Sequence, residues 1–448
     1  MKMMKEKIES NFNDFIEDFK TLIRIPSVYE EDESPYPFGK NVDIALKEML
    51  AIADKLGFDT FYDPNGYYGY AEYGNGDEMI GILGHLDVVP PGDLKKWNNE
   101  PFNPVIKDGK IFGRGTQDDK GPTLGAMYAL KALIDSGVEI NKKIRFIYGT
   151  DEELLWRGIN EYNKKERIPD YGFTPDSNFP LTYAEKGLIQ LNLVAKNETH
   201  IRLKGGDAYN AVPSKIVYDT KDADALGEAL EKLNFEYKKD DNVITVMGKS
   251  VHAKDSEKGI NAICRLLMAM DKIGLESKSI DFIVENILED ALATKIFGDC
   301  KDKASGALKF NVGKIHMDEN SEILNIDIRF PVSIDKQFVL DQLGEVVEKY
   351  GFTIEEHDYL RAVYTPLDSQ LVKTLMESYV EITGDSKSEP ISSGGATYAR
   401  AMDNCVAFGA AFPYTEETEH QPNECIKLDE IKMAIEIYTC ALLKLLKY

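Results

Sequence analysis

The stretch of residues 113–122 holds two adjacent carboxylates, Asp118 and Asp119, between glycines and directly before a helical pattern. Glycine allows the backbone to turn tightly, and a Gly-Pro step at a helix entry fixes the direction in which the chain departs. A carboxylate held at such a turn can bridge two cations with its two oxygens. A polar turn with a solvated acid pair has the same composition, so the neighbouring segments must decide between the two interpretations.

A histidine and an aspartate follow the short apolar run of residues 79–84, which is typical of a strand buried on both faces of a parallel sheet. His85 and Asp87 point to the same side of an extended segment. A neutral imidazole is a good metal ligand, and a nearby carboxylate can hold its other N–H and so fix the tautomer. A structural histidine at the end of a strand is the alternative interpretation.

More acids follow two further segments. The predicted strand 144–148 leads to Asp151, Glu152 and Glu153, and Asp176 comes after another turn. Three consecutive acids are often a solvated loop. Because successive residues differ in direction, however, one glutamate can bind a metal while its neighbour faces the substrate as a base. Strand, acidic tip and helix recur three times, which predicts an α/β, doubly wound sheet with acids gathered at one rim.

The remaining elements indicate a second, inserted domain. From about residue 187 the strands alternate and the acidic tips disappear until the C-terminal part, where His420 lies. The sequence thus predicts a catalytic domain in two parts, 1–186 and 361–448, and an inserted α+β domain over 187–360. Periodicity predicts helices over 15–23, 42–56, 124–137, 259–273, 371–382 and 431–445, and strands over 67–73, 79–84, 144–148, 188–194, 323–329 and 406–409.

Composition limits the partners and the compartment. The 448 residues exceed one ordinary core, and the formal net charge of −24 argues against nucleic acid or anionic membranes as partners. The five cysteines have no C-x-x-C spacing, which disfavours a disulfide framework or a thiolate zinc site. No signal peptide is readable, and no apolar run approaches the length of about 20 residues that spans a bilayer. We therefore expect a cytoplasmic protein.

Together, the segments GHLDVVP, GRGTQDDKGP, GTDEE, TPD, SVHA, IDIRFP, GGATYAR and EHQPNE resemble the co-catalytic metallopeptidase superfamily of aminoacylases, acetylornithine deacetylases, succinyl-diaminopimelate desuccinylases and dipeptidases. The resemblance covers almost the whole chain in order. It implies two divalent metal ions bridged by one carboxylate. Its implied metal ligands are His85, Asp118, Glu153, Asp176 and His420.

The resemblance also assigns the catalytic groups. Glu152 matches the general base that activates a metal-bridging water and later protonates the leaving amine. Asp87 matches the carboxylate behind His85, and His252 matches a lid histidine that stabilises the oxyanion. The peptide bond between Asp118 and Asp119 is expected to be cis.

In the family's substrate pocket, Arg329 matches an arginine that pairs with the free C-terminal carboxylate of the substrate. Asn210 is a weaker match to a substrate contact, and Gly395 and Ala396 would offer backbone groups to the same carboxylate. Ala396 stands where a third glycine is common, which leaves the shape of this carboxylate pocket open.

The long lid, with DDKGP and GGATYAR, is similar to the PepV-type dipeptidases. In that branch the insertion replaces a partner subunit, so the resemblance implies a monomer that cleaves dipeptides. An N-acyl-amino-acid or succinyl-diaminopimelate deacylase with the same metals is the alternative, and a non-catalytic peptide-binding relative is a further one. The ligand types suit zinc best, with manganese or cobalt as alternatives.

Overall fold

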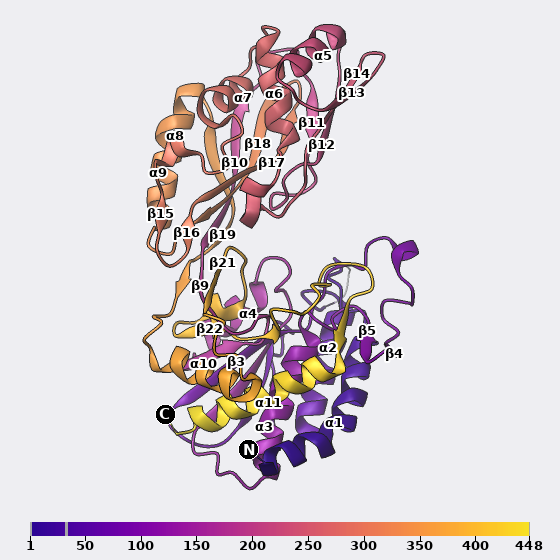
Figure 1. The fold of residues 1–448 in the computed structure, drawn as a ribbon, viewed down its shortest axis with the longest axis vertical. Helices are drawn as coiled ribbons and strands as arrows, with labels where there is room; N and C mark the ends of the chain where they lie inside the picture. The colour runs from indigo at the N-terminus through magenta and orange to yellow at the C-terminus, as the bar shows by residue number, and fades with distance from the viewer. Residues whose placement is uncertain (1, 32–34, 448) are drawn as a thin grey trace. The chain divides into compact units, whose positions relative to one another are not determined.

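The computed structural model describes residues 2–31 and 35–447 and divides into two compact units (Figure 1). The first unit comprises Met1–Tyr183, Thr365–Ile391 and Thr397–Tyr448, and the second comprises Ala184–Tyr364 and Ser392–Ala396. The inserted domain expected over 187–360 thus corresponds to a unit that is a few residues longer at each end. The second unit also takes in the short segment Ser392–Ala396 from the C-terminal part of the chain.

The first unit is built on a mixed sheet in which β1, β2, β6, β3, β7, β22 and β9 are successive neighbours. β6, β3, β7 and β22 run parallel, and the outer pairs are antiparallel. The strands that lie wholly or partly in this unit are β1 (Asp59–Tyr62), β2 (Gly69–Tyr73), β3 (Met79–His85), β4 (Val105–Lys107), β5 (Lys110–Phe112), β6 (Lys143–Gly149), β7 (Tyr171–Thr174), β8 (Ser177–Asn178), β9 (Thr182–Glu185), β21 (Ile391–Ser393), β22 (Cys405–Ala407), β23 (Ala410–Ala411) and β24 (Cys425–Lys427).

The central strand β3 is buried along its whole length, as its apolar sequence predicted. On one face Gly84 lets Thr123 approach so closely that an added Cβ would clash, and on the other face Gly81 packs against Pro169. Both faces of the sheet are therefore covered, and the predicted α/β class is confirmed. The helices are α1 (Lys2–Ile23), α2 (Lys40–Lys55), α3 (Lys120–Asp135), α4 (Arg157–Lys165), α10 (Gln370–Thr383) and α11 (Leu428–Leu445).

Helices α1, α3, α11 and α10 pack against one another in series. α1 begins near the N-terminus, well before the predicted residue 15, because Met4 and Ile8 continue its buried stripe. Phe15 and Tyr128 meet edge to face at 5.4 Å between ring centroids, which fixes α1 against α3. α3 begins at Lys120, directly after the Asp118–Asp119 pair.

The second unit contains an antiparallel sheet in the order β11-β17-β18-β10-β19 and a smaller sheet, β12-β14-β13. Apolar residues of β10, β17 and β18 form its core together with the helices. The elements are β10 (Gly187–Lys196), β11 (Leu203–Gly205), β12 (Lys215–Asp219), α5 (Ala223–Lys232), β13 (Tyr237–Asp240), β14 (Val243–Met247), α6 (Ala262–Lys272), α7 (Lys278–Phe282), α8 (Thr294–Phe297), β15 (Lys301–Asp302), β16 (Gly306–Ala307), β17 (Lys309–Met317), β18 (Ser321–Phe330), α9 (Lys336–Val347), β19 (Thr353–Leu360) and β20 (Val363–Tyr364).

The helix expected from residue 259 begins only at Ala262. The side chain of Asn261 accepts hydrogen bonds from the N–H groups of Ile263 and Cys264, which makes it the N-cap and keeps the preceding residues extended. All five cysteines are free. Within residues 2–31 and 35–447, no helix combines the length and the apolar character needed to cross a bilayer.

Candidate active site

Several candidate residues lie at the carboxyl ends of neighbouring parallel strands. β3 ends at His85, with β6 and β7 hydrogen-bonded on its two sides. β6 leads to Glu152 and Glu153, and β7 leads to Asp176. Since the two following strands lie on opposite sides of β3, the strand order reverses there, and open α/β sheets bind ligands at such a point.

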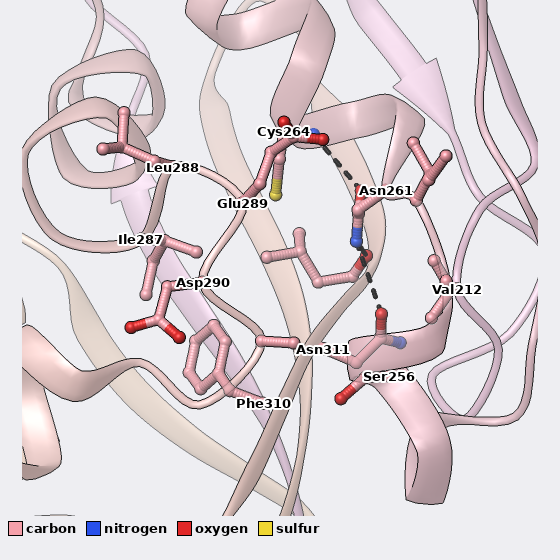
Figure 2. Close-up of a pocket in the computed structure, with 14 residues that line it drawn as sticks. Val212, Ser256, Asn261, Cys264, Ile287, Leu288, Glu289, Asp290, Phe310 and Asn311 are labelled. Atoms are coloured by element: carbon pink, nitrogen blue, oxygen red, sulfur yellow. Dashed lines mark hydrogen bonds between the residues drawn. The ribbon is translucent and has the colours of Figure 1, made fainter. Parts of the chain in front are cut away.

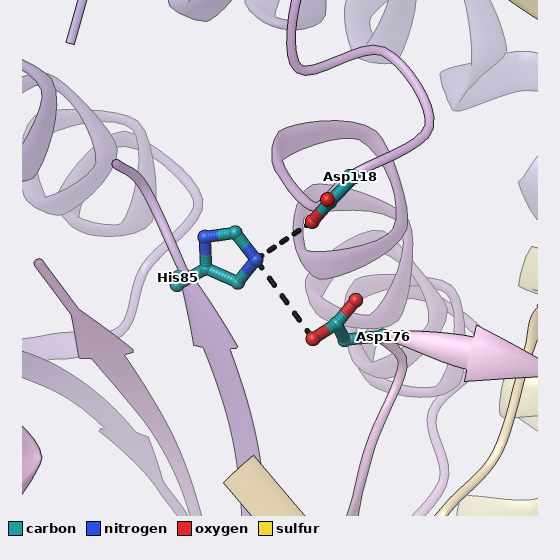
Figure 3. A group of neighbouring side chains, drawn as sticks. All are labelled: His85, Asp118 and Asp176. Carbon is teal, nitrogen blue, oxygen red and sulfur yellow. Dashed lines mark hydrogen bonds and ion pairs between the residues drawn. The ribbon is translucent and has the colours of Figure 1, made fainter. Parts of the chain in front are cut away.

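His85, Asp118 and Asp176 form the first group of side chains that can hold a cation (Figure 3). Nε2 of His85 lies 2.8 Å from Oδ1 of Asp118 and 3.8 Å from Oδ2 of Asp176. One ligand atom from each residue lies within 4.8 Å of the others, so the three side chains surround a position that one metal ion can occupy.

Asp118, Glu153 and His420 form the second group. Nε2 of His420 lies 2.9 Å from Oδ2 of Asp118 and 3.2 Å from Oε2 of Glu153. Asp118 therefore presents Oδ1 to the first group and Oδ2 to the second. A single carboxylate shared in this way is the arrangement expected of a ligand that bridges two cations.

Asp87 contacts residues of both groups. Nδ1 of His85 lies 2.9 Å from the backbone oxygen of Asp87 and 3.6 Å from its carboxylate Oδ1. The sequence suggested that the carboxylate holds the imidazole, but the backbone carbonyl is nearer, and a donated Nδ1–H leaves Nε2 free to bind a cation. The carboxylate Oδ2 instead accepts the N–H of Glu153 at 3.1 Å.

The carboxylates of this region lie so close together that a nearby positive charge would stabilise their ionised forms. Burial, together with the neighbouring carboxylates, raises the pKa of Glu152, Glu153 and Asp176. Oε1 of Glu153 is buried and has no hydrogen-bond partner among the described residues. Buried carboxylate oxygens are costly without a partner, and imidazole and carboxylate are donors that zinc and other divalent ions accept. The two groups therefore fit two divalent cations.

The neighbouring carboxylates also shift the pKa values of His85 and His420. Burial alone would lower the pKa of His85, but its contacts with Asp118 and Asp87 raise the pKa well above the usual value. Burial likewise opposes protonation of His420, while Asp118 and Glu153 raise its pKa to about 11. Both imidazoles are thus surrounded by negative charge that bound cations would neutralise.

The family model for peptidase family M20/M25/M40 matches residues 81–444. The chain belongs to this peptidase family. The matched range includes every ligand candidate from His85 to His420, and membership makes the protein a hydrolytic peptidase. The resemblance stated from the sequence is thereby confirmed.

Named relatives extend over the whole chain. YtjP of Bacillus subtilis strain 168, which is named as a candidate dipeptidase, is 33% identical and the match covers 97% of each chain. A Staphylococcus saprophyticus protein with the same description is 34% identical over 99% of each chain. Human carnosine dipeptidase 1 has a similar fold, with a TM-score of 0.62, 16% identity and full coverage of both chains.

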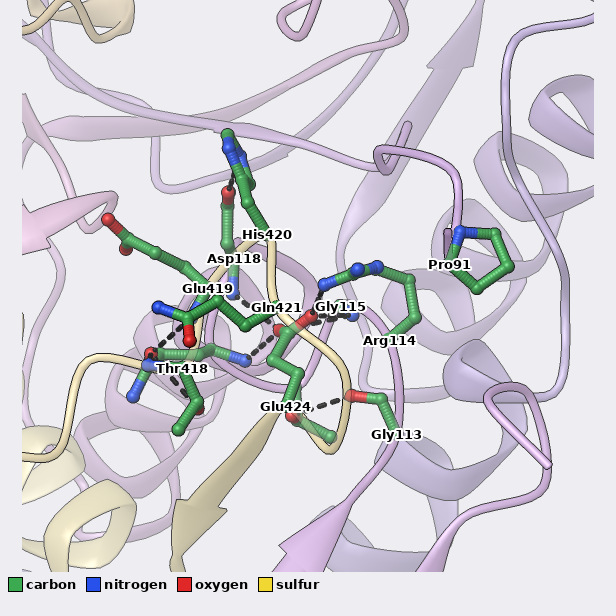
Figure 4. A network of polar contacts seen from close by, with 12 residues as sticks. Pro91, Gly113, Arg114, Gly115, Asp118, Thr418, Glu419, His420, Gln421 and Glu424 are labelled. Atoms are coloured by element: carbon green, nitrogen blue, oxygen red, sulfur yellow. Dashed lines mark hydrogen bonds and ion pairs between the residues drawn. The ribbon is translucent and has the colours of Figure 1, made fainter. Parts of the chain in front are cut away.

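The loop that bears Asp118 in this peptidase is held by a residue to which the sequence assigned no role. Glu424 is fully buried, and its carboxylate accepts the N–H groups of Gly115 at 3.1 Å, Gln117 at 2.8 Å and Asp118 at 3.2 Å (Figure 4). Nη1 of Arg114 donates to the same carboxylate at 2.6 Å. Glu424 thus orients the backbone from which the shared carboxylate projects.

Asp119 joins the same loop to the central strand. The Asp118–Asp119 peptide bond is cis, as the resemblance implied. Oδ2 of Asp119 accepts a hydrogen bond from Oγ1 of Thr123 at 2.6 Å and from the N–H of His85 at 3.4 Å. The first turn of α3 is therefore tied to the end of β3 that carries His85.

In the second unit, His252 lies directly before a short 3₁₀ helix, η2 (Ala253–Lys258). Its Nδ1 accepts the N–H of Lys254 at 3.1 Å. Desolvation, the charge of Arg329 and that of Lys254 lower the pKa of His252 to about 4. The imidazole is thus neutral at physiological pH.

Arg329, also in the second unit, is buried and rigidly held. Its Nε and Nη2 donate to the two carboxylate oxygens of Asp327 at 2.6 and 3.0 Å, and its Nη1 donates to the carbonyl of Gly394 at 2.9 Å. The N–H of Gly395, which was expected to face a substrate, donates to Oγ of Ser393 at 2.9 Å. Ala396 follows in the same segment, Ser392–Ala396.

Asn311 of β17 forms hydrogen bonds with the backbone of the loop that carries Asn210. Nδ2 of Asn311 donates to the carbonyls of Tyr209 and Ala211 at 2.8 and 3.0 Å, and the carbonyl of Asn210 accepts the N–H of Ala253 at 2.8 Å. Asn311 also lines a pocket in this unit (Figure 2). The side chain of Asn210 itself is exposed.

Proposed function

We propose that this peptidase hydrolyses dipeptides that have a free C-terminal carboxylate, and that it uses two divalent metal ions. The observation that carries the proposal is Asp118, whose two oxygens face two separate groups of ligand atoms. The names of its relatives support the substrate class. YtjP, which matches this chain over nearly its whole length, is named as a candidate dipeptidase. The solved relative of similar fold is also named a dipeptidase.

One ion would be held by His85 and Asp176, and the other by Glu153 and His420. Asp118 would be a ligand of both ions. When bound, the ions would polarise the scissile carbonyl and lower the pKa of a water molecule, and zinc fits this donor set best, with manganese or cobalt as alternatives. Glu152 belongs to neither ligand group found among the described residues. We assign it as the general base that takes a proton from the attacking water and gives it to the leaving amine.

The second unit would supply groups for the substrate. The neutral imidazole of His252 would donate its Nε2–H to the oxyanion that develops on the carbonyl. Arg329, pre-oriented by Asp327, would pair with the C-terminal carboxylate of the substrate. Asn210 and the backbone of Gly395 and Ala396 remain proposed contacts for the same end of the substrate.

Two other functions fit the same residues less well. An N-acyl-amino-acid or succinyl-diaminopimelate deacylase would need the same metal ions, but the length of the inserted domain disfavours it. A non-catalytic peptide binder would not need a complete ligand set together with Glu152. We further propose that the enzyme is a monomer, because its long inserted unit resembles that of the PepV-type branch, in which the insertion replaces a partner subunit. The cytoplasm remains its proposed location.

The test is an assay of the metal-loaded protein with a plain dipeptide, its N-acetylated form and a tripeptide, for wild type and Glu152→Ala. We expect cleavage of the dipeptide alone and a loss of about 10²–10⁴-fold in the variant. Preferential cleavage of acylated amino acids would support the deacylase. Binding of peptides without turnover by the wild type would support the non-catalytic relative, and an active Glu152→Ala protein would overturn the assigned base.

A further inference from the structure

Gln117, the residue directly before the shared ligand Asp118, has a buried side chain that reaches the loop carrying His420. Its side chain lies between two segments that are about three hundred residues apart in the sequence. Nε2 donates to the carbonyl of Glu416 at 3.0 Å. Oε1 accepts the N–H groups of Thr418 at 2.8 Å and Glu419 at 2.9 Å.

These contacts fix the orientation of the amide. Two N–H donors of the loop face one end of the side chain and carbonyl oxygens face the other, so the oxygen and nitrogen of Gln117 are not interchangeable. The carbonyl of Cys425 lies 3.4 Å from Nε2 as a second acceptor. A buried amide with all its partners in the protein is a rigid connection, because breaking it leaves unpaired polar groups.

Hydrogen bonds between Thr418 and Cys425 join the two ends of the loop that carries His420. Oγ1 of Thr418 donates to the carbonyl of Cys425 at 3.1 Å and accepts its N–H at 3.0 Å. The side chain of Asn423 donates to the carbonyl of Lys96 at 2.9 Å. His420 itself is half exposed and has a positive φ of 59°. Its position therefore depends on how the loop ends are anchored rather than on burial of its own ring.

Two of the three members of the first ligand group, His85 and Asp176, are positioned without this loop. His85 lies at the end of β3 and Asp176 follows β7, and both strands are fixed in the central parallel sheet. Asp118, which both groups share, is oriented by Glu424 at the far end of this loop, but through its backbone N–H and not through the side chain of Gln117. Among the described residues, the side-chain hydrogen bonds of Gln117 reach only the segment that bears His420.

We propose that Gln117 is a positioning residue for the second cation alone: its side chain sets the spacing between Asp118 and His420 and leaves the group of His85 and Asp176 unaffected. This inference rests on the proposed two-metal function. Loss of a residue that orients a metal ligand typically lowers metal affinity by about 10–100-fold. We expect a loss of this size for one of the two ions in Gln117→Met, which keeps the length of the side chain without its hydrogen bonds.

The experiment is a titration of the metal-free full-length protein with Zn²⁺, read by calorimetry and by the metal content after dialysis. The wild type should bind two ions per chain. Gln117→Met should bind one ion with wild-type affinity and the other about 10–100-fold more weakly. The retained ion also reports that the variant is folded.

Gln421 provides the matched control, because it is an amide on the same loop, next to His420, but it is exposed. Within the described part of the chain, its side chain makes a single hydrogen bond, of 3.5 Å, to the carbonyl of Glu417. Gln421→Met should bind both ions like the wild type. Thr418→Val removes hydrogen bonds from the other side of the Gln117 contact and should weaken the same single ion. This second variant keeps the test decisive if Gln117→Met does not fold.

Two results would overturn the inference: wild-type affinity for both ions in Gln117→Met, or equal weakening of both ions. The titration needs no substrate. A wild type that binds two ions without cleaving dipeptides would therefore count against the proposed function and not against the role of Gln117. A wild type that binds fewer than two ions would overturn both.

Discussion

The backbone N–H of Lys254 donates to Nδ1 of His252 at 3.1 Å. Because one ring nitrogen of a neutral imidazole carries the proton and the other accepts, this contact places the proton of His252 on Nε2. A hydrogen-bond donor held in one tautomer loses little on reorganisation when negative charge develops on a carbonyl oxygen. The contact thus prepares His252 for the role proposed for it.

The first prediction concerns the charge of His252. Desolvation and the charge of Arg329 lower its pKa from 6.5 to about 4, so the neutral ring should persist from pH 8 down to pH 5 and become protonated below that range. An NMR titration should give this value, and Arg329→Gln should move it upward toward 6.5. A wild-type pKa near 6.5 would contradict the environment described for the ring.

The second prediction distinguishes the catalytic role of the His252 imidazole from the structural role of the neighbouring Lys254. His252→Ala should lower kcat by about 10²–10³-fold, the usual cost of losing one oxyanion donor, with a smaller change in KM. Lys254→Ala keeps the backbone N–H that fixes the tautomer and should stay close to wild-type activity. Steady-state kinetics with a dipeptide measure both variants. An equal loss of kcat in the two variants would show that this segment has only a structural role.

Local sequence places some of the proposed ligands at the ends of strands. The apolar run that ends in His85 specifies both a buried strand and what stands at its end, because parallel strands bring their carboxyl ends to one edge. Asp176 was expected only after a turn, and the strand before it, β7, was not among the predicted strands. Asp118 needed the resemblance as well, since an acid pair beside glycines is also a common turn. Its cis bond to Asp119 came from the resemblance alone.

The supports of the ligands were not predictable in this way. Glu424 and Gln117 act through hydrogen bonds to segments about three hundred residues away, and nothing in their own neighbourhoods specifies those partners. The same holds for Asp87, where the choice between carbonyl and carboxylate near His85 depends on a local geometry of fractions of an ångström. Residue types predict chemistry, whereas tertiary structure decides which atom performs it.

The third prediction is that metal removal destabilises only the first unit. All five proposed ligands belong to it, and an ion present at 100 times its Kd stabilises a protein by about 2.7 kcal/mol per site. Chelation should therefore lower the Tm of the first unit and leave the unfolding of the second unit in place. Calorimetry with and without a chelator measures this, and adding zinc back should restore the transition. An unchanged Tm would argue against metal ions bound in the folded state.

The fourth prediction tests the carboxylate anchor. Arg329 keeps its guanidinium plane fixed through two hydrogen bonds to Asp327, so its remaining N–H groups are pre-oriented for a planar carboxylate. Arg329→Met should raise KM for a dipeptide by about 10–100-fold, the cost of losing a hydrogen bond to a charged group. The C-terminal amide of the same dipeptide lacks the negative charge and should be a poor substrate for both proteins.

The comparison of the two substrates is what makes this experiment specific. If Arg329 binds the carboxylate, the ratio of kcat/KM for the dipeptide over its amide should fall toward one in Arg329→Met. If Arg329 only stabilises the second unit, the variant should lose activity toward both substrates by the same factor and the ratio should stay at its wild-type value. Measuring the ratio, rather than either rate alone, therefore separates recognition of the substrate from folding.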